Sequence, residues 1–305
     1  MSLRLNDLLL LIVVLSSMAA GIIFPGFGRY FQDLPSYSLM ALFFLSYFSI
    51  QPRDIRTTLR KDKLTILAFI ILKSLALPVA TYYFFRAVAP EYALAALLLT
   101  GVSTGVVAPF ISNLVKGNSA LVLVVVVITS ALVPFTLPFL IEAVSAVNTA
   151  ISLPSMVRVL VTIIFVPILA VEAVRFLFPR LLTGLEKVRY PFSLLLFAVI
   201  NLGVFSKYSD LFTTDPAQIL MCTIVAVVLA IIACTAGILF FRGRAVEDQL
   251  AGAVMIGNMN NVLVIVFSYV FFGAIEALVA AMYIIPFFGL VIPLRYYARL
   301  RGRRD

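Results

Sequence analysis

The stretch Gly101-Val102-Ser103-Thr104-Gly105-Val106-Val107-Ala108-Pro109 lies inside an apolar segment, residues 91–115, that is long enough to cross a bilayer as a helix. Its two glycines and its proline weaken the helical hydrogen-bond ladder, since proline lacks an N–H and clashes with the preceding turn. A second apolar segment, residues 247–272, contains Met255-Ile256-Gly257-Asn258-Met259-Asn260-Asn261. Asparagines are costly in lipid unless they meet partners or water. We therefore predict two broken membrane helices.

The composition is that of an integral membrane protein. Of 305 residues, 63% are hydrophobic and 12% are charged, and the mean hydropathy is +1.13. Soluble domains carry about 25% charged residues. The chain has no histidine, which removes histidine-ligated metals, Ser-His-Asp triads and histidine pH switches. We therefore expect no catalytic residue, no metal site and no cofactor.

Ten apolar segments approach or reach the length of a membrane-spanning helix, so the fold class that we predict is an all-α membrane protein with ten transmembrane helices. They lie near residues 7–25, 35–51, 64–86, 91–115, 119–141, 155–178, 190–206, 216–240, 247–272 and 275–297. Most basic residues lie in alternate loops and in the C-terminal tail, on one side of the membrane. The positive-inside rule then places both termini in the cytoplasm. We expect a multi-pass protein of the plasma membrane, and the net charge of +9 does not indicate nucleic acid binding.

Ten spans divide into two sets of five, and an odd number in each set makes the second half inverted relative to the first. A weak internal sequence similarity supports this division: Phe48-Ser49-Ile50-Gln51-Pro52-Arg53-Asp54-Ile55 resembles Phe205-Ser206-Lys207-Tyr208-Ser209-Asp210-Leu211. Phe24-Pro25 and Phe178-Pro179 likewise end the first and sixth segments. Inverted repeats with paired broken helices are typical of secondary transporters, whose binding sites lie at those breaks.

Lys73 lies in the middle of an apolar run from about Leu64 to Phe85, and no carboxylate lies at comparable depth nearby. Roughly ten residues, about 15 Å at helical rise, separate it from either end of the run, which is farther than a lysine side chain of about 6 Å reaches. A charge at this depth is expensive and indicates a functional residue. The alternative is a lysine placed at a helix end.

Other polar residues near the breaks are candidates for an ion or substrate site, each with a structural alternative. Asn258, Asn260 and Asn261 could instead be polar packing residues between helices. Thr129 and Ser130 precede Pro134 and could satisfy backbone groups that the proline frees. Asn201 could face a cavity or bond across helices. The complete candidate set is Lys73, Ser103, Thr104, Ser112, Asn113, Thr129, Ser130, Asn201, Asn258, Met259, Asn260 and Asn261.

The two broken segments, together with Lys116-Gly117-Asn118 and Val166-Pro167-Ile168-Leu169, resemble the bile acid:sodium symporter family. That family belongs to the wider bile/arsenite/riboflavin transporter superfamily, which includes arsenite and auxin carriers. The resemblance implies a panel domain of residues 1–51 and 155–208 and a core domain of residues 64–142 and 216–300. It also implies that the fourth and ninth helices break and cross, and that the protein moves organic anions, generally with sodium.

The chain departs from the family where the resemblance places the sodium ligands. The residues at those positions are Ala108 and Pro109, Val122 and Val126, and Met255 and Met259. None of their side chains carries an oxygen that could bind sodium. Lys73 stands where the family has a glutamine. The cysteine that arsenite carriers have at the fourth-segment break is also absent. We hypothesise that the Lys73 ammonium replaces a sodium ion, with the oxygens around Asn258–Asn261 as its partners. Alternatively, Lys73 pairs with the anionic substrate.

The leading prediction is a secondary active transporter that carries a small organic anion by alternating access, with degenerate sodium sites. A proton is expected as the coupling ion rather than sodium, because a buried lysine changes its protonation readily; sodium-independent transport is the other form of this hypothesis. An ordinary sodium-coupled symporter is one alternative. A channel or a membrane sensor is an alternative of another class. An enzyme is not expected, and the partners predicted are the substrate, the coupling ion and the lipid bilayer.

Overall fold

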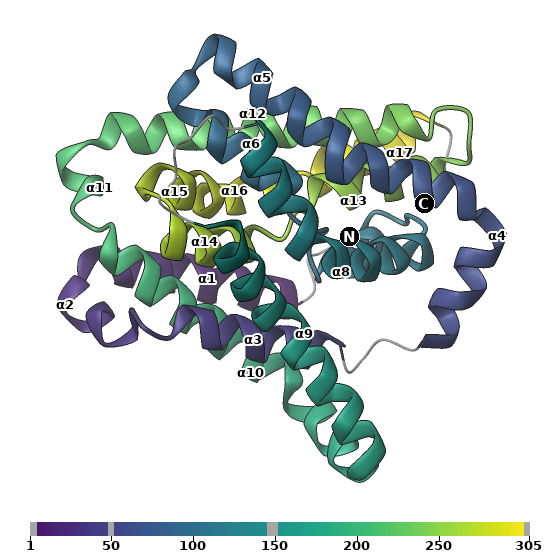
Figure 1. Cartoon of the computed structure of the whole chain (residues 1–305), viewed down its shortest axis with the longest axis horizontal. Helices are drawn as coiled ribbons and strands as arrows, with labels where there is room; N and C mark the ends of the chain where they lie inside the picture. Colours follow the sequence, from purple (N-terminus) through teal and green to yellow (C-terminus); the bar gives the residue numbers. More distant parts are fainter. Residues whose placement is uncertain (1–4, 48–51, 145–151, 302–305) are drawn as a thin grey trace. The chain divides into compact units, whose positions relative to one another are not determined.

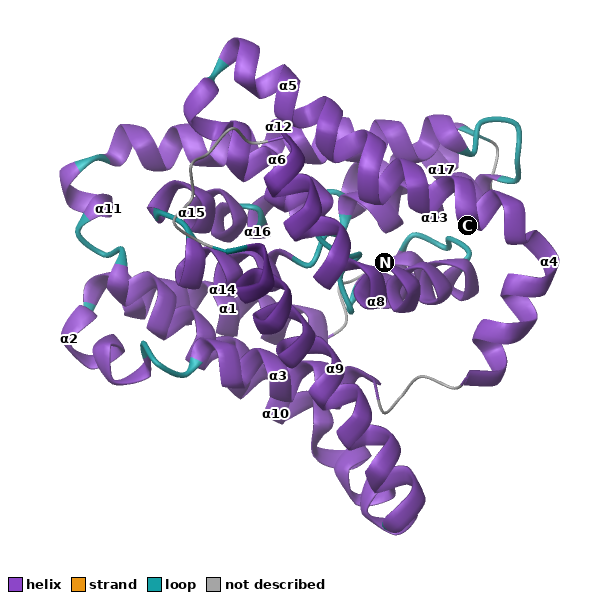
Figure 2. Cartoon of the chain, in the orientation of Figure 1, coloured by secondary structure: helices purple, strands orange, loops and turns teal. Residues whose placement is uncertain are grey.

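The computed structural model describes residues 5–47, 52–144 and 152–301. The regular secondary structure in these ranges is helical, as Figure 2 shows, with isolated β-bridges only at Thr104–Met259 and Arg242–Arg244. The prediction of an all-α protein is therefore confirmed. The chain divides into two compact units, residues 1–50 with 161–219 and residues 51–160 with 220–305. Their assignment as the panel and the core of a transporter stays a prediction.

The first unit is built on α1 (Leu5–Ile23) and α10 (Pro179–Lys207). It also holds α2 (Pro25–Gly28), a 3₁₀ turn (Arg29–Phe31), α3 (Pro35–Tyr47), α11 (Leu211–Thr214) and most of α9 (Leu153–Leu177). The chain bends by 106° between α1 and the helical turns that follow, because Pro25 cannot continue the hydrogen-bond ladder of α1. Asn201 of α10 donates to the Val14 carbonyl at 3.2 Å and to the Ser17 hydroxyl at 3.1 Å, so it bonds across to α1.

The first half of the second unit begins with a long helical segment. It comprises α4 (Pro52–Ile71), which is kinked at Asp62, a π-helical turn (Leu72–Ala76) and α5 (Leu77–Val88), and Figure 1 shows it in dark blue with a bend in α4. A 3₁₀ turn (Pro90–Tyr92) leads into α6 (Ala93–Gly101), and α7 (Ala108–Leu114) follows after a non-helical stretch. The 26-residue α8 (Ser119–Val144) closes this half.

The second half of this unit contains the following helices, the first of which starts in the other unit: α12 (Pro216–Phe240), α13 (Val246–Gly257), α14 (Asn261–Phe271), α15 (Ala274–Met282), α16 (Ile284–Gly289) and α17 (Val291–Leu300). Helices α12 and α13 approach closely at Gly237 and Gly252. A Cβ on Gly237 would lie 2.2 Å from the Gly252 carbonyl oxygen, so this contact requires glycine.

Six helices in the described ranges are long and apolar enough to span a membrane, or up to seven if the bent pair at Pro25 is one span. They support a multi-pass membrane protein. Helices α6, α7, α13 and α14 have 9, 7, 12 and 11 residues, so the two breaks remove them from this count. The ten spans, the inverted repeat and the cytoplasmic termini stay predictions.

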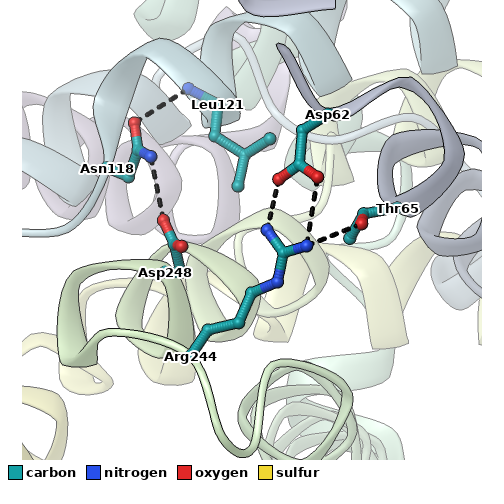
Figure 3. Close-up of polar contacts among 6 residues, drawn as sticks. All are labelled: Asp62, Thr65, Asn118, Leu121, Arg244 and Asp248. Atoms are coloured by element: carbon teal, nitrogen blue, oxygen red, sulfur yellow. Dashed lines mark hydrogen bonds and ion pairs between the residues drawn. The ribbon is translucent and has the colours of Figure 1, made fainter.

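Hydrogen bonds and an ion pair between polar side chains connect α4, α8 and the start of α13 within the second unit (Figure 3). Arg244, between α12 and α13, forms a two-pronged ion pair with Asp62 and also donates to the Thr65 hydroxyl at 2.8 Å. Hydrogen bonding to Asp62 raises the pKa of Arg244 above its ordinary value. Asn118 donates to the Asp248 carboxylate at 2.9 Å and accepts from the Leu121 N–H at 3.2 Å. Asn118 therefore caps α8 and holds it to the start of α13.

Candidate functional site

The two predicted helix interruptions are present, and their backbones are hydrogen-bonded to each other. Helix α6 ends at Gly101 and α7 begins at Ala108, while α13 ends at Gly257 and α14 begins at Asn261. The Gly105 N–H donates to the Asn258 carbonyl at 2.7 Å, and the Asn260 N–H donates to the Ser103 carbonyl at 2.9 Å. We call this antiparallel pairing of residues 102–107 with residues 258–260 the crossover.

The crossover has two faces. Thr104 and Met259 stand opposite each other in the antiparallel bridge, so their side chains lie on the same face. The backbone of Asn258 and Asn260 is not extended, with ψ of 73° and 69°, and the Asn261 N–H folds back to the Met259 carbonyl at 2.9 Å.

Thr104 connects its face of the crossover to the helices around it. Its hydroxyl donates to the Met255 carbonyl in α13 at 2.6 Å. Its N–H donates to the hydroxyl of Thr129 in α8 at 3.1 Å, and Thr129 in turn donates to the Val125 carbonyl at 2.7 Å. Thr129 therefore satisfies a backbone N–H that the helix break leaves free.

Lys73 is fully buried in the π-helical turn, and its ammonium donates to the Thr100 carbonyl at 2.8 Å and to the Val102 carbonyl at 2.7 Å. These oxygens lie at the C-terminal end of α6, where a helix leaves carbonyls unpaired and carries negative partial charge. In the described part of the chain, Lys73 forms no ion pair with a carboxylate.

The prediction that Lys73 binds oxygens around Asn258–Asn261 is wrong, because the bonded carbonyls belong to the first break. The physical reason is packing: the π-helical turn that carries Lys73 packs against α6, whose last carbonyls are the nearest acceptors. Sequence reasoning expected backbone carbonyls at a helix break as the partners of Lys73, but it chose the second break instead of the first.

The three asparagines of the second break each make a structural hydrogen bond. Asn258 donates to the Phe287 carbonyl at 3.1 Å, and Asn261 donates to the Ala280 carbonyl at 3.3 Å. The Asn260 side chain accepts from the Leu263 N–H at 3.2 Å and so caps α14. The structural alternative, that these asparagines are polar packing residues, therefore holds for these hydrogen bonds.

Unpartnered polar atoms nevertheless remain at the crossover. The Ser103 hydroxyl, the Asn258 side-chain oxygen and the Asn260 side-chain nitrogen are buried and have no hydrogen-bond partner. The Ser130 hydroxyl, one residue beyond Thr129, is also buried and unpartnered. Buried polar groups are nearly always hydrogen-bonded, so several unpaired ones at the two helix breaks indicate a place for a polar ligand or water.

The remaining predicted residues lie elsewhere or have other contacts. Ser112 of α7 is buried with an unpartnered hydroxyl, whereas Asn113 is exposed and accepts from the Ser119 hydroxyl at 2.6 Å. Met259 is fully buried opposite Thr104. Asn201 belongs to the first unit, where it bonds across helices as described above.

Sequence reasoning missed Tyr283, which lies between α15 and α16. Its side chain is fully buried, and its hydroxyl donates to the Gly257 carbonyl, the last of α13, at 2.6 Å. The available signal was a tyrosine inside the apolar segment 275–297, because a buried phenol hydroxyl needs a hydrogen-bond partner.

Comparison with known proteins identifies the family. Residues 8–215 match the sodium bile acid symporter family, a family of transporters. The matched range includes Lys73, the first helix break and Thr129, and ends before the second break. Comparison with curated proteins finds no match. Because the matched range is more than half of the 305 residues, the chain belongs to the sodium bile acid symporter family.

Proposed function

We propose that this protein is a secondary active transporter that carries a small organic anion by alternating access, with the crossover as the centre of its binding site. The observation that carries the proposal is the pairing of two broken helices through the Gly105–Asn258 and Asn260–Ser103 hydrogen bonds, beside buried polar atoms without partners. Transporter sites lie where paired helices of this kind are interrupted. Membership of a transporter family supports the same function.

Ser103, Asn258 and Asn260 are the proposed substrate contacts. They offer a hydroxyl, an amide oxygen and an amide nitrogen that no protein group satisfies, so they can both donate to and accept from a ligand. The N-terminus of α14, at Asn261, adds the positive end of a helix. A small molecule with a carboxylate and a nearby hydroxyl or amide fits this combination.

Lys73 is the proposed replacement for a bound sodium ion. Its ammonium supplies a positive charge and two hydrogen bonds to the C-terminal carbonyls of α6, which are the kind of oxygen ligands that coordinate a cation in transporters. Transport is then independent of sodium, and the driving ion is a proton or a counter-transported anion. Sodium coupling by a site elsewhere in the chain is the alternative.

The two compact units are proposed to act as the panel and the core of the transporter. The transport cycle is then a movement of one unit against the other.

Equivalent packing in the two halves of the second unit supports an inverted repeat. A Cβ on Gly101 would lie 3.5 Å from Pro78, and a Cβ on Gly257 would lie 2.5 Å from the Cys234 sulfur. Gly101 and Gly257 are 156 residues apart in the sequence, and Pro78 and Cys234 are also 156 residues apart.

We place both termini in the cytoplasm of a plasma-membrane protein, on the basis of loop charge.

Uptake into proteoliposomes that contain the purified chain tests this function. A panel of labelled small carboxylates is offered with an inside-negative potential or a pH gradient, in sodium chloride and in choline chloride. Accumulation above the external concentration, equal in both salts, supports the proposal. Equilibration without accumulation indicates a channel, and accumulation only in sodium chloride indicates an ordinary sodium symporter. No uptake or binding of any organic anion rules out the proposed substrate class.

A further inference from the structure

The C-terminal end of α13 has its own hydroxyl donors. Tyr283 is fully buried, and its hydroxyl donates to the carbonyl of Gly257, the last residue of α13, at 2.6 Å. Two residues earlier, the Met255 carbonyl accepts from the Thr104 hydroxyl, also at 2.6 Å. The final carbonyls of a helix lack partners within the helix, so these hydroxyls satisfy acceptors that would otherwise be open.

The oxygens just beyond this helix end are occupied as well. The Asn258 carbonyl accepts from the Gly105 N–H at 2.7 Å, and the Met259 carbonyl accepts from the Asn261 N–H at 2.9 Å. The arrangement parallels that of the first break, where Lys73 binds the last carbonyls of α6. The last carbonyls of both broken helices therefore accept hydrogen bonds from protein side chains. The donor is a lysine ammonium at the end of α6, and the donors are hydroxyls at the end of α13.

We infer that Tyr283, together with Thr104, closes the end of α13 to metal cations, as Lys73 closes the end of α6. A helix C-terminus carries negative partial charge, and its free carbonyls are hard oxygen ligands that attract sodium in broken transporter helices. A hydroxyl that donates to such a carbonyl occupies one of the two lone pairs of its oxygen and directs a positively polarised hydrogen at it, which disfavours a cation at that oxygen. Tyr283 is thus a positioning residue: it holds the break in its cation-free form and does not itself touch the substrate. This inference rests on the proposed sodium-free crossover and extends it to the second break.

Packing around Tyr283 supports a specific role in holding the break. Asn258 donates to the Phe287 carbonyl, one turn after Tyr283, so Tyr283 and α16 are bonded to the two successive residues Gly257 and Asn258. Changing Tyr283 to phenylalanine removes the hydroxyl and leaves the ring and the Asn258–Phe287 bond in place. A tyrosine that merely fills space would tolerate this change without any new response to cations.

Thermal unfolding of the full-length chain in detergent tests the inference without knowledge of the substrate. The variants Tyr283→Phe and Thr104→Val each free one carbonyl at the end of α13. Tyr82→Phe, at a buried tyrosine of α5, and Thr104→Ser, which keeps the hydroxyl, are the matched controls. Each protein is unfolded in sodium chloride and in choline chloride at equal ionic strength.

We expect equal midpoints in the two salts for the wild-type protein and both controls. Tyr283→Phe should unfold about 2–4 °C higher in sodium chloride than in choline chloride, because a cation that binds only the folded state raises its stability. Equal midpoints for Tyr283→Phe overturn the inference and leave the proposed function standing. A higher midpoint in sodium for the wild-type protein overturns the sodium-free crossover itself. If Tyr283→Phe does not fold, Thr104→Val against Thr104→Ser decides in the same way.

Discussion

The ammonium nitrogen of Lys73 lies 2.7 Å from the carbonyl oxygen of Val102, the residue at which α6 gives way to extended backbone. A second bond, to Thr100, places the charge against two of the acceptors that the helix leaves unpaired at its end. The cost of a buried charge is offset by these charge-assisted bonds and by the negative end of the helix. Lys73 is therefore structurally part of the first helix break, although it lies on a different helix.

The first prediction concerns Lys73→Met, which keeps the length of the side chain but removes the charge and the donors. Loss of two charge-assisted hydrogen bonds should lower the free energy of unfolding by about 1–3 kcal/mol. Sodium or potassium should restore part of it by occupying the freed carbonyls. The measurement is thermal or denaturant unfolding with and without salt. Lys63→Met, at an exposed lysine near the start of the same segment, is the control. A Lys73→Met protein as stable as wild type would contradict the capping role.

The second prediction concerns Ser103→Ala, which removes an unpartnered buried hydroxyl. Stability should stay the same or rise slightly, because no internal hydrogen bond is lost. The KM for transport should rise roughly fivefold, which corresponds to the loss of one hydrogen bond of about 1 kcal/mol to the substrate. Ser268→Ala, at another buried and unpartnered serine in α14, should change neither quantity. An unchanged KM for Ser103→Ala would remove Ser103 from the substrate site.

The third prediction concerns Gly105→Ala at the centre of the crossover. A Cβ at this position would lie 2.9 Å from the Asn258 carbonyl oxygen and 3.1 Å from that of Met259. The strands of the crossover must then separate, and we expect a loss of about 1–3 kcal/mol of stability together with loss of transport. Gly289→Ala, where nothing lies within 4 Å of the added carbon, should be neutral or stabilising. Normal transport by Gly105→Ala would show that the backbone pairing is not required.

The fourth prediction concerns Asn118, which donates to Asp248 and caps α8. Asn118→Asp keeps the cap but sets two carboxylates against each other, so stability should fall by about 1–3 kcal/mol at neutral pH.

The control for Asn118 is the exchanged pair Asn118→Asp with Asp248→Asn. It restores one donor and one carboxylate, and it should recover most of the wild-type stability at neutral pH. The measurement is the unfolding midpoint between pH 4 and pH 8. If the double variant is no more stable than Asn118→Asp alone, the contact in Figure 3 does not hold the two helices together.

Several features could be predicted from sequence because they depend on local properties of the chain. The proline at position 109, the glycines at 101 and 105 and the asparagines after Gly257 weaken a helix through local properties of the backbone, and both predicted interruptions are present. The composition predicted an all-α membrane protein, and family membership is confirmed by the match over residues 8–215. The count of ten spans is not confirmed, since residues 91–115 and 247–272 are divided into short helices and α3, in the segment 35–51, has 13 residues.

The sequence by itself determined that the helices break at these places and that Lys73 is buried, because apolar length, proline and glycine act through neighbouring residues. Only the tertiary structure decided which groups meet: Lys73 with Thr100 and Val102 rather than with Asn258–Asn261, and Tyr283 with Gly257. The physical reason is that a hydrogen bond between distant residues depends on how the helices pack. In a chain whose spans are almost uniformly apolar, hydrophobic periodicity does not reveal which face of each helix turns inward.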